Sequence, residues 1–318
     1  MSQGCLLVSL GTPASPAPED IREFLAAFLS DPSVVDFPKF LWKPILNQIV
    51  LKKRPQMIAE QYEKIWLSEG SPLAVYTEAQ TKLVAQELSD HDVDYAYTYT
   101  KPGIIEQLEA MFQRGVRNCK IIPLFPHYAP STVAEIQRQV TAARNNPNLT
   151  GMNLQIIPQW EDYYPYIEWY AQQINEAWKE HNFHHLVVSY HGVPERKAHE
   201  PENYRQQCER TTAAILQALK KFGEPGFTVE QTFQSKFGPG KWLGPATIDR
   251  MAELPAAGKT RIAVINPGFV QDCIETLDEI DVLNREAFLE AGGEELHRIA
   301  PLNSHPAAGK ILAGLLSR

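Results

Sequence analysis

A histidine follows one of the most apolar runs in the chain. His191 comes directly after LVVSY and is followed by Gly192, Val193 and Pro194. A proline so soon after the run disfavours a continuing helix, so we expect His191 at the carboxyl edge of a sheet, where α/β proteins bind ligands. A neutral imidazole, with an ordinary pKa of roughly 6.5, can accept a proton or bind a metal ion there. A histidine that only hydrogen-bonds within a strand-to-loop turn is the alternative, and a lone His-Gly leaves it open.

A row of carboxylates forms the second candidate. The segment NPGFVQDCIETLDEID carries Asp272, Glu275 and Glu279 at spacing i, i+3 and i+7, which places them on one face of a predicted helix over 272–290. Like charges three or four positions apart cost about 0.2–0.5 kcal/mol per pair, so a cation or a wet environment is needed. Favourable charge at a helix N-terminus accounts for the first two acids without any function, but it fades after the first turn. The third acid therefore favours a functional reading.

A basic and apolar segment forms the third candidate. Residues 38–54, PKFLWKPILNQIVLKKR, combine large apolar side chains with five basic residues and no acid. Such a segment could be a lip that touches lipid or a flat apolar ligand. A helix packed on the core with solvated lysines is the alternative. Pro44 interrupts the pattern, so one continuous helix is not expected.

The elements that must position these residues alternate along the chain. Short β-rich runs are followed by long helical patterns, which is typical of parallel sheets with crossover helices, so the fold class is α/β. The expected strands are 5–10, 93–98, 119–125, 153–158, 185–190, 228–233, 261–266 and 296–300. Two sets of four strands predict two similar doubly wound lobes with a ligand cleft at the carboxyl ends of the strands.

Three segments are expected as organising units. The first lobe spans 1–160 and the second lobe 161–305, while 306–318 forms a C-terminal helix that packs across to the first lobe. The chain has 318 residues, which is ample for two domains of ordinary size.

Composition and missing motifs exclude several classes of protein. The net charge of −8 has the wrong sign for a nucleic-acid-binding surface. Four dispersed cysteines match neither a zinc spacing nor a disulfide framework and favour a reducing compartment. A signal peptide and a membrane-spanning run are not expected. The phosphate-loop, dinucleotide-binding, G-x-S-x-G and H-E-x-x-H patterns are missing from the sequence, which argues against the corresponding chemistries.

Six ordered motifs carry a resemblance that covers nearly the whole chain. They are LLVSLGTP, EGSPL, PLFPHYAPST, SYHGVPER, TFQSKFGPGKWLGP and PGFVQDCIETLDEI. Together they resemble the ferrochelatase family, metal chelatases of the lyase class that insert ferrous iron into a porphyrin in the last stage of haem synthesis. The resemblance implies two Rossmann-like lobes, each with a four-stranded parallel sheet flanked by helices, and an active-site cleft between them.

The same resemblance assigns roles to individual residues. It implies that His191 and Glu275 are the catalytic pair and the metal ligands, with the order of metal binding and proton acceptance left open between them. Asp272 and Glu279 match an acidic relay. The porphyrin-binding positions that it implies are Leu10, Arg54, Tyr62, Ser71, Pro194, Trp242 and Phe269.

The resemblance also implies substrates and surroundings. Fe²⁺ and protoporphyrin IX are the expected substrates, since Leu10 stands where relatives that use coproporphyrin usually have tyrosine. No tightly bound cofactor and no iron–sulfur cluster are expected, because the last cysteine is Cys273. The expected location is cytoplasmic, with peripheral membrane contact through 38–54, and no nucleic-acid partner is expected.

Some positions depart from the family pattern, and two rival functions remain. Lys197, Pro201 and Ala246 stand where the family usually has other residue types, which leaves the local conformation and substrate fit there open. A cobalt or nickel chelatase that acts on a more reduced tetrapyrrole is one alternative. A porphyrin or haem carrier without turnover is the other, and retention of both His191 and Glu275 argues against it.

Overall fold

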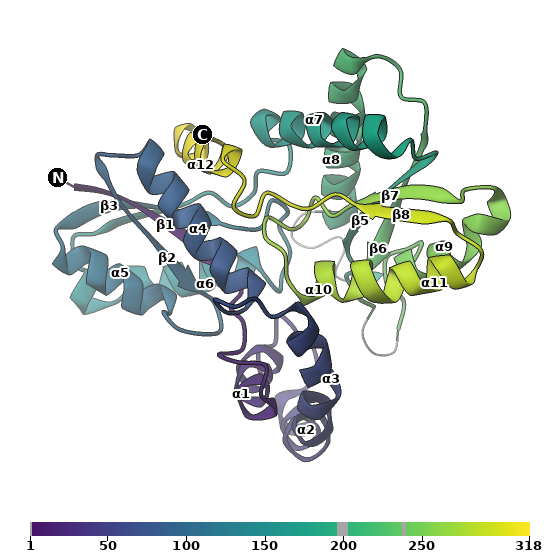
Figure 1. The fold of residues 1–318 in the computed structure, drawn as a ribbon. Helices are drawn as coiled ribbons and strands as arrows, with labels where there is room; N and C mark the ends of the chain where they lie inside the picture. Colours follow the sequence, from purple (N-terminus) through teal and green to yellow (C-terminus); the bar gives the residue numbers. More distant parts are fainter. Residues whose placement is uncertain (1, 196–202, 237–239) are drawn as a thin grey trace. The chain divides into compact units, whose positions relative to one another are not determined.

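The computed structural model describes residues 2–195, 203–236 and 240–318. Contacts divide the chain into unit 1, which comprises Met1–Gln159 and Asn303–Arg318, and unit 2, which comprises Trp160–Leu302. Each unit is built on one parallel sheet (Figure 1). The candidate residues 197 and 201 lie outside the described part of the chain.

Unit 1 is a four-stranded sheet in the order β2-β1-β3-β4, and every neighbouring pair is parallel. Its strands are β1 (Ser2–Ser9), β2 (His91–Tyr97), β3 (Val116–Pro123) and β4 (Asn153–Ile156). Helices α4 (Pro72–Glu87), α5 (Ile104–Gln113), α6 (Val133–Arg144) and α12 (Ala307–Gly314) belong to the same unit. Short 3₁₀ turns cover Pro147–Leu149 and Leu315–Ser317.

The core of unit 1 explains why these strands are so apolar. Leu6 and Val8 on one face of β1 share a buried cluster with residues of α5 and α6. Strands of a parallel sheet are covered on both faces by crossover helices, so they read as nearly continuous apolar runs. The C-terminal helix α12 packs against α4 (Figure 1). Gln80 of α4 donates a hydrogen bond to the Asn303 carbonyl at 2.9 Å, just before that helix.

The predicted lip lies in a helical arm of unit 1. Helix α1 (Pro18–Leu29) precedes α2 (Lys39–Ile45), a π-helical segment (Leu46–Val50) and α3 (Leu51–Ile65). Pro44 lies inside α2, and helical turns continue without a loop from Lys39 to Ile65, so the expected interruption was wrong. The hydrogen-bonding pattern changes two residues after this proline, where the wider π turn begins at Leu46.

Unit 2 repeats the architecture with the order β6-β5-β7-β8, again entirely parallel. Its strands are β5 (His185–His191), β6 (Thr228–Gln234), β7 (Arg261–Ile265) and β8 (Glu295–Arg298). Its helices are α7 (Tyr164–His181), α8 (Tyr204–Leu219), α9 (Thr247–Glu253), α10 (Ile274–Leu277) and α11 (Arg285–Glu290), with a π-helical segment Glu279–Asn284 and 3₁₀ turns Lys220–Phe222 and Pro255–Ala257. Figure 1 shows α7 and α8 on one face of this sheet and α9 to α11 on the other.

The predicted fold class and the two four-stranded parallel sheets are confirmed. The predicted acidic helix over 272–290 is wrong in its bounds and in its regularity. Helix α10 starts only at Ile274, and the backbone passes through a π-helical segment before α11 begins. The sequence pattern assumes a uniform period of 3.6 residues, which a π turn breaks.

Candidate active site

His191 is the last residue of β5, at the carboxyl edge of the sheet in unit 2. Its Nδ1 lies 2.7 Å from the Gly192 carbonyl oxygen. Because a carbonyl oxygen can only accept, Nδ1 carries the proton, and Nε2 of the neutral ring keeps its lone pair. The Tyr204 hydroxyl donates to the His191 carbonyl at 3.1 Å, which anchors the backbone. The ring is thus set up to accept a proton or bind a cation through Nε2.

The loop after His191 is held close to the end of β6. The Gly192 N–H donates to the Gln234 carbonyl at 2.7 Å. A Cβ at this glycine would lie 2.7 Å from the same oxygen and 3.4 Å from Cε3 of Trp242, so a larger residue would push the loop away. Glycine is therefore required for the histidine strand and β6 to end side by side.

Two predicted porphyrin-binding residues meet in this loop. Pro194 and Trp242 pair as an antiparallel bridge, although they are far apart in the sequence. The Leu243 N–H donates to the Val193 carbonyl at 3.0 Å beside them. A cavity of about 400 Å³ opens here, lined by Gly192, Glu195, Phe233, Gln234, Lys236, Gly240, Lys241, Trp242, Leu243, Gly244 and Ala246.

Phe269 lies near the histidine, in the turn after β7. The centroids of the His191 and Phe269 rings are 6.4 Å apart, with 50° between the ring planes. Two buried tyrosines hold the turn: Tyr166 donates to the Pro267 carbonyl at 2.9 Å, and Tyr170 donates to the Asn266 carbonyl at 3.3 Å. An aromatic wall is therefore fixed beside the imidazole.

Glu275 lies in the first turn of α10 and is held at two points. The Gln234 side-chain amide donates to the Glu275 carbonyl at 2.6 Å. The Cys273 Sγ lies 2.9 Å from Oε2 of the Glu275 carboxylate. Burial raises the pKa of the Cys273 thiol well above its usual range, and the nearby Glu275 charge adds to this, so the thiol keeps its proton and donates.

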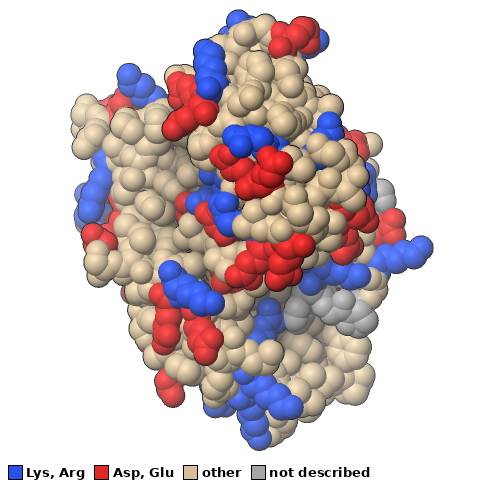
Figure 2. Space-filling view, turned by 45° about the vertical axis from the view of Figure 1, so that its right-hand side comes forward, with Lys and Arg blue, Asp and Glu red and all other residues tan. Residues whose placement is uncertain are grey.

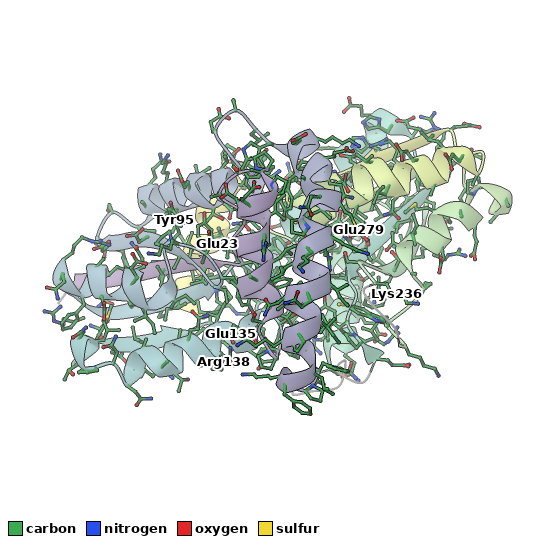
Figure 3. The ribbon with its side chains drawn as sticks, turned by 90° about the horizontal axis from the view of Figure 1, so that it is seen from below. Glu23, Tyr95, Glu135, Arg138, Lys236 and Glu279 are labelled. Carbon is green, nitrogen blue, oxygen red and sulfur yellow. The ribbon has the colours of Figure 1, made fainter. Side chains whose placement is uncertain are left out.

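Glu279, which Figure 3 labels, is the first residue of the π-helical segment. It is fixed by Ser235, the residue after β6. The Ser235 N–H donates to Oε1 at 2.6 Å, and the Ser235 hydroxyl donates to Oε2. Ser235 has a φ of 63°, a left-handed conformation that is costly outside glycine and that points both donors at the carboxylate.

The electrostatics of Glu279 connect the two central residues. Burial raises the pKa of the Glu279 carboxyl above its ordinary value, and the negative charge of Glu275 adds to the rise. The Ser235 hydrogen bonds oppose it, as does the charge that His191 carries whenever its ring is protonated. Glu279 therefore lies within electrostatic reach of both His191 and Glu275 in unit 2.

Asp272 lies outside the predicted helical face, whereas its part in an acidic relay stays a prediction. It precedes the Cys273 cap and lies outside the helix, so the i, i+3, i+7 spacing does not apply. Its buried carboxylate pairs with Arg298 at 2.8 Å and accepts the Thr276 hydroxyl at 2.7 Å. Through these two contacts, Asp272 stabilises the start of helix α10.

Arg298, at the end of β8, forms ion pairs with two aspartates of the acidic segment and so acts as a clamp on it. Besides Asp272, its Nε binds Asp281 at 2.7 Å, and Arg285 pairs with Asp281 as well. Burial alone would raise the pKa of Asp281, but the hydrogen bond and charge of Arg298, with help from Arg285, hold it below its usual value. The two aspartates flank Glu275 and Glu279, so the clamp fixes the stretch between them.

The remaining predicted porphyrin positions belong to unit 1. Leu10 follows β1, and the buried Ser71 hydroxyl lies 2.7 Å from the Thr12 hydroxyl in the same loop. Tyr62 is buried on α3 and packs edge-on against Trp66 at a centroid distance of 6.2 Å. Arg54 is half-buried on the same helix.

A ready-made metal centre is not found in the described ranges 2–195, 203–236 and 240–318: no three or more His, Cys, Asp or Glu side chains there are arranged to hold an ion. Ala246, one of the departures from the family pattern, caps α9 without a side-chain hydrogen bond and lines the cavity.

Comparison with known proteins identifies the family. A family model described as ferrochelatase matches residues 2–318. The coproporphyrin III ferrochelatase of Lactococcus lactis subsp. lactis is 39% identical over 317 residues, covering 99% of this chain and 98% of that protein. The ferrochelatase of Pectobacterium atrosepticum is 38% identical over 317 residues, with the same coverage of 99% and 98%. The chain belongs to the ferrochelatase family.

Membership of this family makes the chain an enzyme of metal insertion into porphyrins, in haem biosynthesis. Its fold matches a solved structure titled SirB from Bacillus subtilis with Fe³⁺, with a TM-score of 0.58 and 12% identity over 100% of this chain and 95% of that one. The sirohydrochlorin chelatase SirB of Bacillus subtilis subspecies spizizenii, in complex with cobalt, matches with a TM-score of 0.54 and 12% identity. At this identity the likeness concerns the fold.

Sequence reasoning missed four residues of the ferrochelatase site. Gln234, Ser235 and Cys273 hold the carboxylates, and each lies inside a motif that was noticed for its neighbours. Their amide, hydroxyl and thiol groups are common in structural roles, so residue type alone carries little signal. Arg298 lies outside all six motifs, and its only signal is a basic residue that ends a buried strand.

Proposed function

We propose that this chain inserts Fe²⁺ into protoporphyrin IX and releases two protons to give protohaem, with His191 and Glu275 as the central pair. The observation that supports the proposal most is Gln234, which pairs with His191 across β5 and β6 and whose side-chain amide donates both to the Glu275 carbonyl and to the Glu279 carboxylate. The carboxyl edge of the sheet is where open α/β sheets bind their ligands. The central pair itself lies entirely within unit 2.

The chemistry calls for these residue types. A porphyrin loses two pyrrole protons as the metal ion enters, so the site needs proton acceptors. His191 offers Nε2, and Glu279 is a buried carboxyl whose raised pKa brings it closer to neutral pH, where proton transfer is most effective. Carboxylates also suit a partly hydrated divalent cation and lower the cost of removing its water. Metal binding and proton acceptance are shared between His191 and Glu275, and we commit to the pair.

Apolar walls would hold the macrocycle. Pro194, Trp242 and Phe269 are half-buried and lie in the loops that flank His191. Flat apolar surfaces pack against aromatic and proline side chains, and a ring held against such walls can be bent so that its nitrogen lone pairs become accessible. We propose that Arg54, Tyr62 and Ser71 meet the propionates, for which a guanidinium is a bidentate partner.

The finer choice of porphyrin rests on Leu10. The Lactococcus relative is named for coproporphyrin III, whereas the Pectobacterium relative is named only as a ferrochelatase. Coproporphyrin III carries propionates where protoporphyrin IX has two vinyl groups. An apolar side chain such as leucine suits a vinyl group better than a carboxylate, whose burial is costly. We therefore propose protoporphyrin IX as the preferred substrate.

The helical arm supports peripheral contact with a membrane. Among the described residues, no helix is long and apolar enough to cross a bilayer. Large apolar side chains in the arm are nevertheless exposed, including Phe40 at 78% and Ile49 at 55%. Exposed lysines, Lys39, Lys43 and Lys52, lie among them. Apolar groups that insert at the interface and cations that meet anionic headgroups form the usual pair of signals for surface binding.

We also propose that the enzyme works without an iron–sulfur cluster or other resident cofactor. The four cysteines are buried and unpaired by disulfides. The charges support small substrates rather than nucleic acid, because the net charge is −8 and acidic and basic side chains lie interspersed on the face that Figure 2 shows.

The experiment is an anaerobic metallation assay. Purified protein is mixed with excess porphyrin and Fe²⁺, and the visible spectrum is followed over many equivalents of product. We expect multiple turnover, with a higher kcat/KM for protoporphyrin IX than for coproporphyrin III. Binding limited to one equivalent without turnover would leave a carrier, and a preference for coproporphyrin III would reverse the substrate assignment alone.

A further inference from the structure

Cys273 makes two different contacts at the start of α10. Its sulfur accepts the backbone N–H of Thr276, which completes a helix cap. The same Sγ lies 2.9 Å from Oε2 of Glu275, and because a carboxylate can only accept, the thiol is the donor. A cap needs only the first contact. The second points from the cap into the candidate active site.

We propose that Cys273 is a positioning residue that holds the Glu275 carboxylate in one orientation through its thiol hydrogen bond. The inference rests on the proposed function, because Glu275 is the carboxylate that we assign to metal handling. It adds a residue that acts through Glu275 and does not itself bind the substrates.

The surroundings of Glu275 show why such a device matters. The Gln234 amide fixes the Glu275 backbone carbonyl at 2.6 Å, but a glutamate side chain still turns about three bonds. In the described part of the chain, Cys273 is the one side chain that hydrogen-bonds the Glu275 carboxylate. Ordering that carboxylate before the metal ion arrives removes an entropic cost from each turnover.

The thiol contact and the cap can be separated by substitution. Cys273→Ala removes both the cap acceptor and the donor. Cys273→Ser keeps both, since a hydroxyl accepts and donates. Cys273→Asp keeps a good cap acceptor but has no proton to donate at neutral pH. A cap role predicts that Asp behaves like Ser, whereas a positioning role predicts that Asp behaves like Ala.

The kinetic test measures kcat and KM for the metal ion at saturating porphyrin, with Zn²⁺ as well as Fe²⁺. We expect Cys273→Ala and Cys273→Asp to raise the metal KM about 10-fold, from loss of a hydrogen bond to a charged group, and Cys273→Ser to stay within about 2-fold of wild type. Cys119→Ala is the matched control, because it removes a buried thiol from the core of unit 1, and its metal KM should not change. A wild-type metal KM in Cys273→Asp or Cys273→Ala overturns the proposal.

A spectroscopic readout separates this inference from the proposed function. The infrared S–H stretch of Cys273, identified by difference against Cys273→Ala, should shift to higher frequency in Glu275→Ala, where the acceptor is lost. An unshifted band overturns the positioning role whatever the activity. A shifted band in a protein that does not metallate porphyrin supports the positioning contact and overturns the proposed function alone.

Discussion

Single side chains at the end of β6 carry much of the site. Gln234 binds the Glu275 backbone, and Ser235 binds the Glu279 carboxylate through both its N–H and its hydroxyl. These donors stabilise the charged form of Glu279, while burial disfavours it and wins. The balance places a carboxyl with a raised pKa beside His191. Ser235, a residue type with no special signal in the sequence, thus limits the rise in the pKa of the Glu279 carboxyl.

Removing one donor should shift this balance in a definite direction. In Ser235→Ala the hydroxyl hydrogen bond to Glu279 is lost, so the pKa of Glu279 rises further. If Glu279 must be deprotonated to accept a proton, the acidic limb of the kcat–pH profile moves to higher pH. The profile of metallation between pH 5 and pH 9 is the measurement.

A companion variant checks the origin of that shift. Glu279→Gln removes the titrating group, so adding Ser235→Ala to it should cause no further movement of the acidic limb. An equal shift in the presence and absence of the carboxyl would assign the limb to another group and contradict the role of Glu279.

Glu275 itself offers a second prediction at this scale. Glu275→Gln keeps the size and the backbone contact with Gln234 but removes the charge. We expect kcat/KM for the metal ion to fall by at least about 100-fold, because the desolvated cation loses an anionic ligand, while porphyrin binding persists. Steady-state kinetics and a porphyrin fluorescence titration measure the two effects. Loss of porphyrin binding without loss of metal affinity would move Glu275 out of the metal-handling role.

At the scale of elements, the acidic segment is held together by Arg298. Asp272 and Asp281 flank the two functional carboxylates, and the guanidinium binds both. The pKa of Asp281 lies below its usual value, so its contribution to stability is present above the unfolded-state pKa of about 3.9 and is lost as the pH falls through the lower folded value. The pairing is therefore a stabilising device at neutral pH.

Asp281→Asn should reveal that device. We expect the free energy of unfolding at pH 7 to fall by about 1–3 kcal/mol, the range for a hydrogen bond to a charged group in a half-buried setting. The difference from wild type should shrink as the pH falls below about 4, because the carboxyl of the unfolded chain then binds a proton before that of the folded chain does. Urea unfolding at pH 7 and at pH 3.5 measures both. A difference that is independent of pH would rule out the ion pairs as its cause.

At the scale of elements, the strands could be predicted from the sequence, but the shape of the acidic helical segment could not. Short apolar, β-rich runs such as LVVSY and RIAVI predict all eight strands, because burial on both faces makes such strands apolar throughout. The helical face of Asp272, Glu275 and Glu279 could not be predicted in the same way. The Cys273 cap starts the helix late, and a π turn follows at Glu279, and neither leaves a periodic signal. The same holds for Pro44, which sits inside α2 and is followed two residues later by a π turn.

At the scale of the whole molecule, the two similar units hold different functional residues. Unit 2 holds His191 and the carboxylates, and unit 1 holds the exposed arm and the residues expected at the propionates. The motifs predict which residues matter, and the sheet topology explains why those of unit 2 gather at one edge. What the sequence does not contain is the set of contacts between motifs, such as Gln234 with Glu275 and Trp242 with Pro194.

The helical arm supports a prediction about membrane contact. The double substitution Phe40→Ser with Ile49→Ser removes two exposed apolar side chains without touching the core. We expect co-sedimentation with anionic phospholipid vesicles to fall by at least about 10-fold, since burial of each such side chain is worth roughly 1.5–3 kcal/mol at most. Exposed Phe222, which lies on unit 2, serves as the matched control through Phe222→Ser. Equal vesicle binding by the arm variant and wild type would contradict a membrane role for 38–54.

The central claim is that His191, paired with Glu275, carries metal insertion. The most direct test is multiple-turnover metallation of porphyrin by His191→Ala, measured anaerobically beside wild type, with circular dichroism to establish that both are folded. His191 lies half-buried at a strand end, so the variant should fold, and loss of a proton acceptor should lower kcat by at least about 100-fold. A folded His191→Ala protein with near-wild-type turnover would contradict the account.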